Sequence, residues 1–212
     1  APPGHISVGN GLSVAGPLAR SPDDIEIALD ILASPQEQDR IAWSFKLPKA
    51  RSNKIEDLKI AVWPEEEYAE VDSETSSLIS ATVEDLKSAG AKIENVTPPF
   101  SFRDSDDVYS KLLNPLMIAG APQKTLNQID EIAKTIEDDD MSSMSKTARG
   151  ASLLARDWIV VNAKRQFMRQ QWRAFFENYD VILCPVCVLP ALKHDHRPFH
   201  ERSLMINGKE RE

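Results

Sequence analysis

The pattern of apolar positions predicts an amphipathic helix near the start of the chain. From Ile25 onward, apolar side chains recur at spacings of three and four residues, which is the period of one helical face. Ser21 can cap the N-terminus of this helix, Pro22 suits its first position, and the two acidic residues that follow complement the helix dipole. The pattern therefore predicts a helix over residues 22–33 that ends before Pro35.

A segment further along the chain predicts a strand, a helix and a second strand. Residues 58–63 are a short apolar run ended by a proline, and residues 92–97 form a second run before two prolines. Between them, Asp72 or Ser73 can cap a helix that is followed by Gly90 at its C-terminus. This spacing is typical of a βαβ unit, so we expect a parallel pair joined by a right-handed crossover.

The rest of the chain predicts mostly helix. Helical patterns cover residues 104–118, 123–137 and 146–178, and residues 181–183 form a compact apolar strand. Helices that alternate with short strands are typical of an α/β protein. We therefore expect an α/β fold with a mixed sheet flanked by helices.

The composition excludes several classes of protein. The 212 residues are 42% hydrophobic and 27% charged, which is ordinary usage for a globular protein with a core. The net charge is −8 and the 25 basic residues form no cluster, which argues against a nucleic-acid or acidic-membrane partner. No apolar run approaches the roughly 20 residues that a membrane helix needs, and no signal peptide is evident. We therefore expect a cytoplasmic protein.

Both ends of the chain differ from ordinary natural ends. The chain begins with Ala1-Pro2-Pro3-Gly4 rather than with Met, and it stops shortly after Asn207-Gly208. An Asn-Gly pair normally joins two strands, so it predicts a strand that once followed and has been lost. These features favour a fragment, a proteolytic product or a shortened expression product.

The most prominent local motif is Cys184-Pro185-Val186-Cys187. Its spacing matches thiol–disulfide exchange sites, in which the N-terminus of a following helix lowers the pKa of the first thiol. Pro190 comes three residues after the motif and argues against such a helix, and a structural zinc site would need two further ligands. We favour two buried or pocket-lining cysteines, with a CPxC oxidoreductase and a metal site as alternatives.

Three further groups of residues carry chemical side chains in an unfavourable context. His194 and His196 would share one face of a strand, but histidines in a polar loop are more often solvated than bound to a metal. Ser7 lies near two glycines without completing the G-x-S-x-G pattern of a nucleophile elbow. The carboxylates of residues 138–140 would point in different directions, as in a solvated turn. The residues alone therefore assign no catalytic group, metal or cofactor.

Taken in order, several segments resemble one known family. Residues 16–33 closely resemble the G-P-L/M-A-R-S-x-x-D…A-L-D-x-L-A signature of the amidase-signature family. Further segments resemble the same family in the same order, namely Leu58–Val62, Val71–Ala91, Tyr179–Pro185 and Arg202–Lys209. The chain thus resembles the C-terminal portion of an amidase-signature hydrolase, with residues 1–212 forming part of one amidase-signature domain and a partial amidase-signature fold.

The resemblance implies hydrolysis of a carboxamide, or in some members an ester, without metal or cofactor. In the family a serine attacks the carbonyl, a second serine in a cis peptide relays the proton to a lysine, and backbone N–H groups form the oxyanion hole. This chain has no Gly-Gly-Ser-Ser-like stretch and no matching lysine, so no catalytic residue is assigned and the chain alone is expected to be inactive. The expected partner is a small-molecule amide substrate in the full-length enzyme, and a homodimer stays open.

The resemblance gives roles to three residues of this chain. Arg20 lies where the family keeps an arginine, and it either makes a structural ion pair near the active-site wall or is solvated at the helix start. Cys184 and Val186 follow the C-terminal end of a strand, where α/β proteins bind ligands, and the family places this region near its acyl pocket. We therefore expect both to bind substrate. The alternatives are the amidase subunit of a tRNA-dependent amidotransferase and a non-catalytic binding module.

Overall fold

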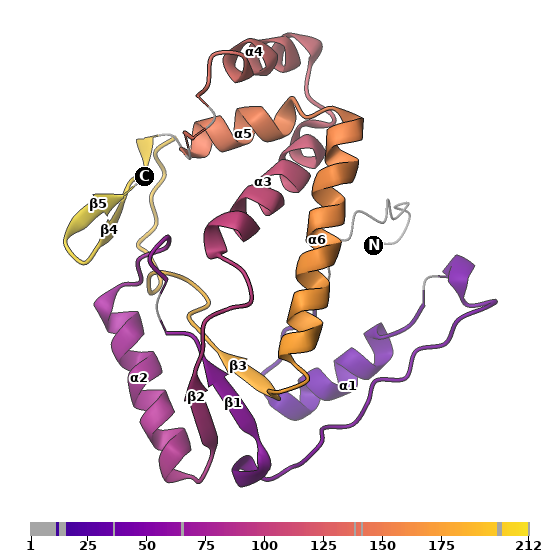
Figure 1. The fold of residues 1–212 in the computed structure, drawn as a ribbon, viewed down its shortest axis with the longest axis vertical. Coiled ribbons are helices and arrows are strands. Elements are labelled where there is room, and N and C mark those ends of the chain that lie inside the picture. The colour runs from indigo at the N-terminus through magenta and orange to yellow at the C-terminus, as the bar shows by residue number, and fades with distance from the viewer. Residues whose placement is uncertain are drawn as a thin grey trace. The chain divides into compact units, whose positions relative to one another are not determined.

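The computed structural model describes residue 12 and residues 16–35, 37–64, 66–137, 139–140, 142–198 and 201–211. The chain forms two compact units, Ala1–Asn53 and Lys54–Glu212 (Figure 1). Ser7 and Asp138, both named above as candidates, lie outside the described residues. Each unit is therefore described by itself.

The first unit contains α1 (Pro22–Leu32) and the short 3-10 helix η1 (Glu37–Asp39). The predicted N-cap is confirmed, since the Asp24 N–H donates to Ser21 Oγ at 3.2 Å and Pro22 is the first helical residue. No residue of α1 is buried, and its apolar side chains are exposed, Ile31 to 72%. The helix that the pattern predicts is thus present, with its apolar face uncovered by its own unit.

The second unit is built on a three-stranded parallel sheet with the strand order β2-β1-β3 (Figure 1). The strands are β1 (Lys59–Val62), β2 (Lys92–Asn95) and β3 (Val181–Leu183), and η2 (Ile55–Asp57) precedes the first. In the central strand, Ile60 pairs with Ile93 on one side and Val181 on the other. The predicted parallel βαβ pair and the predicted third strand are confirmed.

The core of this unit lies between the sheet and α2 (Ser73–Ser88), which connects β1 to β2. Ile60 and Val62 of the central strand pack with Val83 of α2, and partly buried apolar side chains surround them. Asp72 is the N-cap of α2, and Gly90 has the positive φ of 93° that ends a helix in the left-handed region. Both ends of the helix therefore lie where the capping residues predict them.

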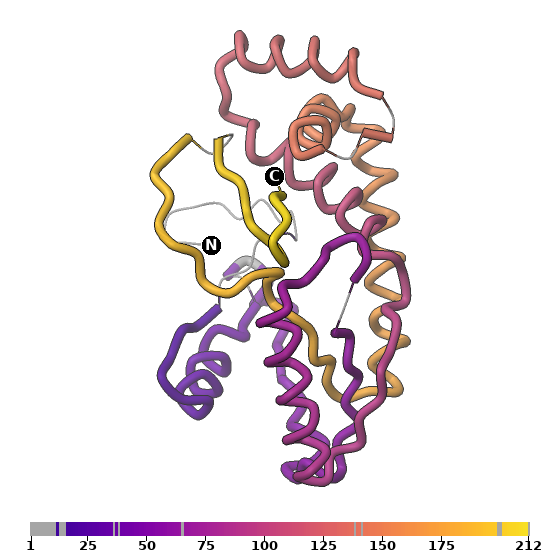
Figure 2. Tube along the Cα trace, turned by 90° about the vertical axis from the view of Figure 1, so that its left-hand side faces the viewer, coloured from indigo at the N-terminus to yellow at the C-terminus, as the bar shows by residue number. Residues whose placement is uncertain are grey.

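Among the described residues, this unit also contains helices between β2 and β3 (Figure 1). They are α3 (Phe102–Ile118), α4 (Gln123–Ala133), α5 (Ser143–Ala151) and α6 (Ala155–Phe175). Helix α3 packs against α5 and α6, and α4 packs against α5. Both views show α4 and α5 at one end of the unit and α2 with the sheet at the other (Figure 2).

The predicted single helix over residues 146–178 is wrong, because α5 and α6 are separate helices. Helix α5 ends where the Ser152 N–H donates to the carbonyls of Ala148 and Gly150, and α6 begins after Leu154. The apolar pattern runs through this corner without a proline, and Gly150 is needed for close packing on α3 rather than for a helix end. Periodicity alone therefore gives no sign of the change in direction.

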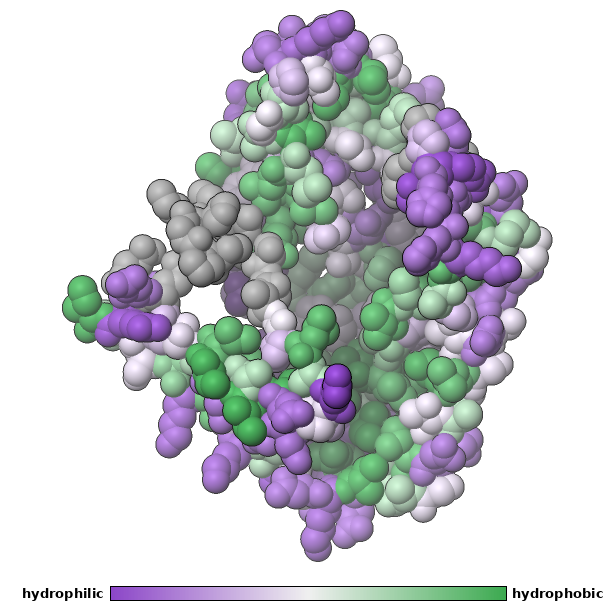
Figure 3. Space-filling model, turned by 180° about the vertical axis from the view of Figure 1, so that it is seen from behind, coloured by the Kyte–Doolittle hydropathy of each residue, from purple (hydrophilic) through white to green (hydrophobic). Residues whose placement is uncertain are grey.

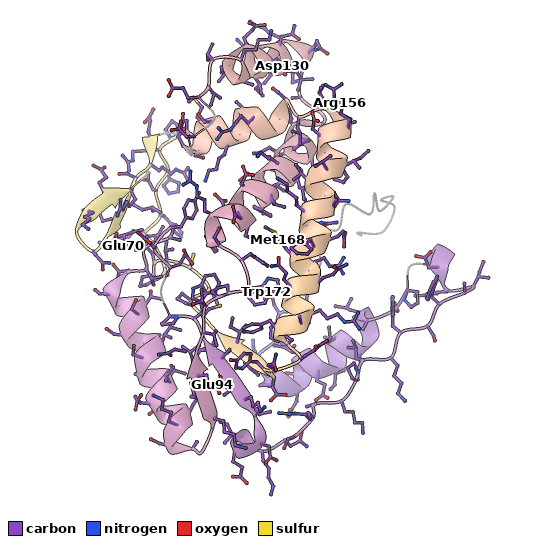
Figure 4. All side chains as sticks on the ribbon, in the orientation of Figure 1. Glu70, Glu94, Asp130, Arg156, Met168 and Trp172 are labelled. Carbon is purple, nitrogen blue, oxygen red and sulfur yellow. The ribbon has the colours of Figure 1, made fainter. Side chains whose placement is uncertain are left out.

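An aromatic cluster holds the C-terminal end of α6 beside the sheet. The ring of Trp172, which is labelled in Figure 4, contacts Phe100 at a centroid distance of 5.6 Å, and Phe100 follows β2. The same indole contacts Phe175 at 5.2 Å, and Phe175 contacts Tyr179 at 4.8 Å just before β3. The Gln171 side chain donates to the Pro99 carbonyl at 3.1 Å. These aromatic side chains pack against one another and against the chain on either side of the sheet.

A two-stranded antiparallel hairpin follows, formed by β4 (Leu204–Ile206) and β5 (Lys209–Arg211). Its turn residues Asn207 and Gly208 have φ of 51° and 76°, as a tight hairpin turn requires. The prediction of a lost strand after this pair is wrong, because β5 is that strand. The α/β class is confirmed, with parallel and antiparallel pairing in two separate sheets.

The tip of the hairpin is fastened to the N-terminus of α2. The Asn207 side chain accepts from the Ser73 N–H at 2.8 Å and donates to Glu70 and to the Val71 carbonyl, both at 3.1 Å. Arg211 pairs with the same Glu70 carboxylate, which is labelled in Figure 4. Asn207 therefore supplies both the turn conformation and the contacts that fix the hairpin.

Replacing Asn207 should loosen the hairpin from α2. We expect Asn207→Ala to lower the free energy of unfolding by about 1–2 kcal/mol. The substitution removes the side-chain acceptor for the Ser73 N–H at the start of α2, and it places an alanine in the left-handed turn conformation. Hydrogen exchange of residues 204–211 reports the effect. Asn207→Gly is the matched control, since it keeps the turn and removes the amide. Equal exchange in Asn207→Ala and the unchanged protein would contradict this role.

No helix in the described part of the chain is long and apolar enough to cross a bilayer.

Candidate functional site

A small cavity lies at the C-terminal edge of the parallel sheet, where β1 and β3 end side by side. Its volume is about 150 Å³, and its walls are the loop 63–71, Phe102 at the start of α3, and the segment 184–188 after β3. The Trp63 N–H donates to the Leu183 carbonyl at 2.9 Å, which continues the strand pairing to the cavity mouth. The sheet therefore positions both loops of this site.

One hydrogen bond and two ring contacts hold the cavity walls together. The Asp72 N–H donates to the Val188 carbonyl at 2.8 Å and so ties the loop before α2 to the segment after β3. The Phe102 ring lies between two other rings, with centroid distances of 5.9 Å to Trp63 and 6.0 Å to Tyr68. One wall of the cavity is therefore aromatic and built from side chains that support one another.

Cys184, Val186 and Cys187 all line this cavity. The Cys184 side chain is half-buried, the other two are exposed, and both thiols are free. Residues 184–198 contain no helix, so the motif is not followed by the helix N-terminus that a CPxC redox site uses to activate its first thiol. The structure therefore supports pocket-lining cysteines over a CPxC redox site. Substrate binding by Cys184 and Val186 stays a prediction.

The other candidates from the sequence lie apart from the cavity lining. His194 and His196 are exposed with ring centroids 6.1 Å apart, and the Arg197 guanidinium holds the pKa of Asp195 at about 2. Arg20 is exposed just before α1 in the first unit, and its ion pair near the active-site wall stays a prediction. Asp140 accepts from Ser145 Oγ at the N-terminus of α5 and so acts in capping.

A larger depression covers one face of α4. Its lining residues, from Lys124 to Ile132, all belong to this single helix. A ligand site encloses its ligand between several elements, whereas one helical face leaves most of a ligand in solvent. The sheet-edge cavity is therefore the stronger candidate.

The pattern of the sequence gives no sign of a polar cluster beside the cavity. The Tyr68 hydroxyl donates to Asp106 Oδ2 at 2.7 Å, and Lys146 Nζ donates to the same oxygen at 2.8 Å. These residues come from the loop before α2, from α3 and from α5. Since they are 38 and 40 residues apart along the chain, no local motif could announce them. The cluster fixes Tyr68, and through it the aromatic wall.

The pKa values in this cluster show a partly buried, ionised pair. Burial raises the pKa of Asp106, but hydrogen bonds from Lys146 and Tyr68 outweigh it and hold that pKa below 3.8. Burial lowers the pKa of Lys146, and the carboxylate outweighs it and raises that pKa. Burial and the carboxylate together raise the pKa of Tyr68. All three side chains therefore keep their ordinary charge at neutral pH.

Removing the Asp106 charge should destabilise the protein at neutral pH and not in acid. We expect Asp106→Asn to cost about 1–2 kcal/mol of unfolding free energy at pH 7, because two donors lose a charged acceptor. Since folding lowers this pKa, the stabilisation exists above pH 3.8 and is lost as the pH falls through the folded value. Denaturant unfolding at pH 7 and in acid measures the difference.

Asp107→Asn is the control for this effect. Asp107 pairs with Lys111 one helical turn away on the same helix, so its loss should cost under about 0.5 kcal/mol. Equal costs for the two variants, or a cost of Asp106→Asn that persists in acid, would contradict the pairing described.

One family model and several known proteins match this chain in sequence. The model of the Amidase family matches residues 3–209. An indoleacetamide hydrolase of Bradyrhizobium japonicum is 25% identical over 179 residues, which are 84% of this chain and 37% of that protein. A glutamyl-tRNA(Gln) amidotransferase subunit of Gloeothece citriformis is 25% identical over 214 residues, covering 90% and 43%.

Solved structures of the same family share the fold. A bacterial aryl acylamidase of the amidase signature family superimposes with a TM-score of 0.60 at 18% identity, covering 92% of this chain and 41% of that one. A fatty acid amide hydrolase superimposes with a TM-score of 0.57 at 24% identity, covering 81% of this chain and 30% of that one. The chain thus spans less than half the length of each of these relatives. With the family model matched over nearly its whole length, the chain belongs to the Amidase family.

Proposed function

We propose that this chain is the pocket-bearing portion of an amidase that hydrolyses a carboxamide C–N bond with a serine nucleophile supplied by another part of the full-length protein. The observation that carries the proposal is the family match over residues 3–209 together with a cavity at the carboxyl edge of the sheet. Ligands of open α/β sheets bind at that edge. An indoleacetamide hydrolase among the relatives favours amide hydrolysis as the reaction.

The proposal includes that the chain alone is inactive. One described serine next to a carboxylate is Ser145, whose Oγ lies 2.5 Å from Asp140 Oδ2. Ser145 is buried, and its hydrogen bond is the main cause of the lowered pKa of Asp140, which makes the carboxylate a weak base. Lys146 follows directly, but its pKa is raised by Asp106 and it keeps its proton. Neither group can activate a nucleophile at neutral pH.

Uncovered apolar surface supports a larger parent domain. Val160 and Phe167 of α6 are exposed to 58% and 62%, and Val181 on the edge strand β3 to 42%. Green, apolar side chains are visible on the face shown in Figure 3. Contiguous apolar patches and open strand edges are normally covered in a folded protein. We propose that the rest of the amidase domain covers them.

A second candidate follows from the relatives that are glutamyl-tRNA(Gln) amidotransferase subunits, such as the one 25% identical over 90% of this chain. In that case the parent protein would work in an assembly with other subunits. Amide hydrolysis by the full-length protein purified without partners favours the amidase, and activity that appears only with co-purified subunits favours the amidotransferase.

The experiment is to join this chain to the rest of its coding sequence and measure release of ammonia from small carboxamides. We expect hydrolysis that a serine-directed fluorophosphonate abolishes. Ala69→Trp fills the cavity and should raise KM or abolish turnover, whereas Ser77→Trp on the exposed face of α2 should leave turnover unchanged. Full-length protein without hydrolysis of any carboxamide would overturn the proposal.

A further inference from the structure

The sheet-edge cavity has the size and lining of a site for a single ring. Its volume of about 150 Å³ is large enough for one benzene-sized group, and the exposed Val186 and Cys187 leave the cavity partly open to solvent. Its aromatic side chains are Trp63 and Phe102, whose ring centroids are 5.9 Å apart. A long acyl chain would not fit in this cavity and would extend beyond it.

The negative charge in the cavity lining disfavours anionic ligands. Glu66 is the charged residue of the lining, and one of its oxygens accepts from the Tyr68 N–H at 3.3 Å, which holds the carboxylate in the loop. No lysine or arginine lines the cavity among the described residues to offset this charge. A ligand that carries its own carboxylate would be repelled and would lose hydration without a partner.

The two thiols fit the same ligand. Cys184 and Cys187 both line the cavity and are free, and sulfur makes favourable contacts at the edge of an aromatic ring. Val71 and Val188 add apolar surface from the two loops that the Asp72 N–H joins. A bound ring would thus have aromatic, aliphatic and sulfur atoms among its neighbours.

From this geometry we infer that the cavity binds the uncharged aryl group of an amide substrate, with one ring, in preference to anionic aryl or short aliphatic groups. The inference rests on the proposed function, in which this cavity is part of the substrate site. It assigns a specificity-determining role to Trp63 and Phe102 and places the ring beside Cys184 and Cys187.

The native thiols allow a direct test. Alkylation of Cys184 and Cys187 by iodoacetamide is followed by mass spectrometry in the presence of benzamide, benzoate or butyramide. At a benzamide concentration of about twice its dissociation constant, the alkylation rate should fall about threefold, because occupied protein is shielded. Benzoate and butyramide at the same concentration should leave the rate unchanged. Equal protection by all three, or none by benzamide, would overturn the inference.

Two variants test whether benzamide slows alkylation by binding in the cavity. Ala69→Trp fills the cavity and should make the alkylation rates with and without benzamide equal, while Ser77→Trp on the exposed face of α2 should preserve the threefold difference. Protection that survives in Ala69→Trp would place benzamide elsewhere and overturn the inference. If Ala69→Trp fails to fold, the three-ligand comparison on the unchanged chain still decides.

The outcome is separable from that of the proposed function. Benzamide-specific protection with no hydrolysis by the full-length protein would support an aryl site and overturn the amidase. Hydrolysis of aliphatic carboxamides by the full-length protein, without benzamide-specific protection, would support the amidase and overturn the aryl site.

Discussion

Leu112→Ala should be among the most destabilising substitutions in the chain. Leu112 is fully buried, at 0% exposure, in α3 where this helix packs between α5 and α6. Truncation removes apolar contacts and leaves a cavity that the packed helices can fill only in part, so we expect a loss of about 2–5 kcal/mol in unfolding free energy. Denaturant unfolding followed by circular dichroism measures it.

Leu116 lies one turn further along the same helix and provides the control. Its side chain is 37% exposed, so Leu116→Ala should cost roughly 1 kcal/mol or less. If the two variants lose similar stability, Leu112 does not lie at the centre of the helical layer, and the packing of α3 described above is contradicted.

Gly150→Val should destabilise the helical layer by about 3 kcal/mol, because the new side chain would overpack a tight contact. A Cβ at Gly150 would lie 2.8 Å from the Ser110 carbonyl oxygen and 2.9 Å from Asn114 Cβ. The carbonyl belongs to α3 and cannot move alone, so α5 would have to shift. The shift would also stretch the 3.1 Å hydrogen bond from Asn114 to the Lys146 carbonyl.

Gly120→Val is the matched control for the contact at Gly150. A Cβ at Gly120 meets nothing within 4 Å, so the same substitution should change the unfolding free energy by less than about 1 kcal/mol. Equal losses at the two glycines would mean that glycine is required for its backbone at both positions rather than for the close approach of α5 to α3.

The parts of the fold that the sequence predicts correctly are those with local chemical signals. Ser21, Pro22, Asp72 and Gly90 mark helix ends because each satisfies a specific backbone need at one position. The short runs ended by prolines mark the three parallel strands for the same reason. The corner between α5 and α6 has no such signal, since it depends on α5 packing against α3, a contact between segments about 40 residues apart.

Part of the candidate site could likewise be predicted from local signals, and part of it could not. Cys184 and Val186 could be placed at the carboxyl end of a strand, because the apolar run before them and the proline after it are local. The aromatic wall could not, since Trp63 and Phe102 meet only when β1 and α3 are assembled. The Tyr68–Asp106–Lys146 cluster likewise exists only in the folded unit. Contacts between residues so far apart along the chain leave no recurring pattern in the sequence from which they could be predicted.

We propose that this chain carries the pocket of an amidase and relies on the rest of the protein for the nucleophile. The most direct test is to treat the purified 212-residue chain with a serine-reactive fluorophosphonate and to assay it for hydrolysis of small carboxamides, beside the full-length protein. We predict labelling and turnover in the full-length protein and neither in this chain. Turnover by this chain that the fluorophosphonate abolishes would contradict the claim.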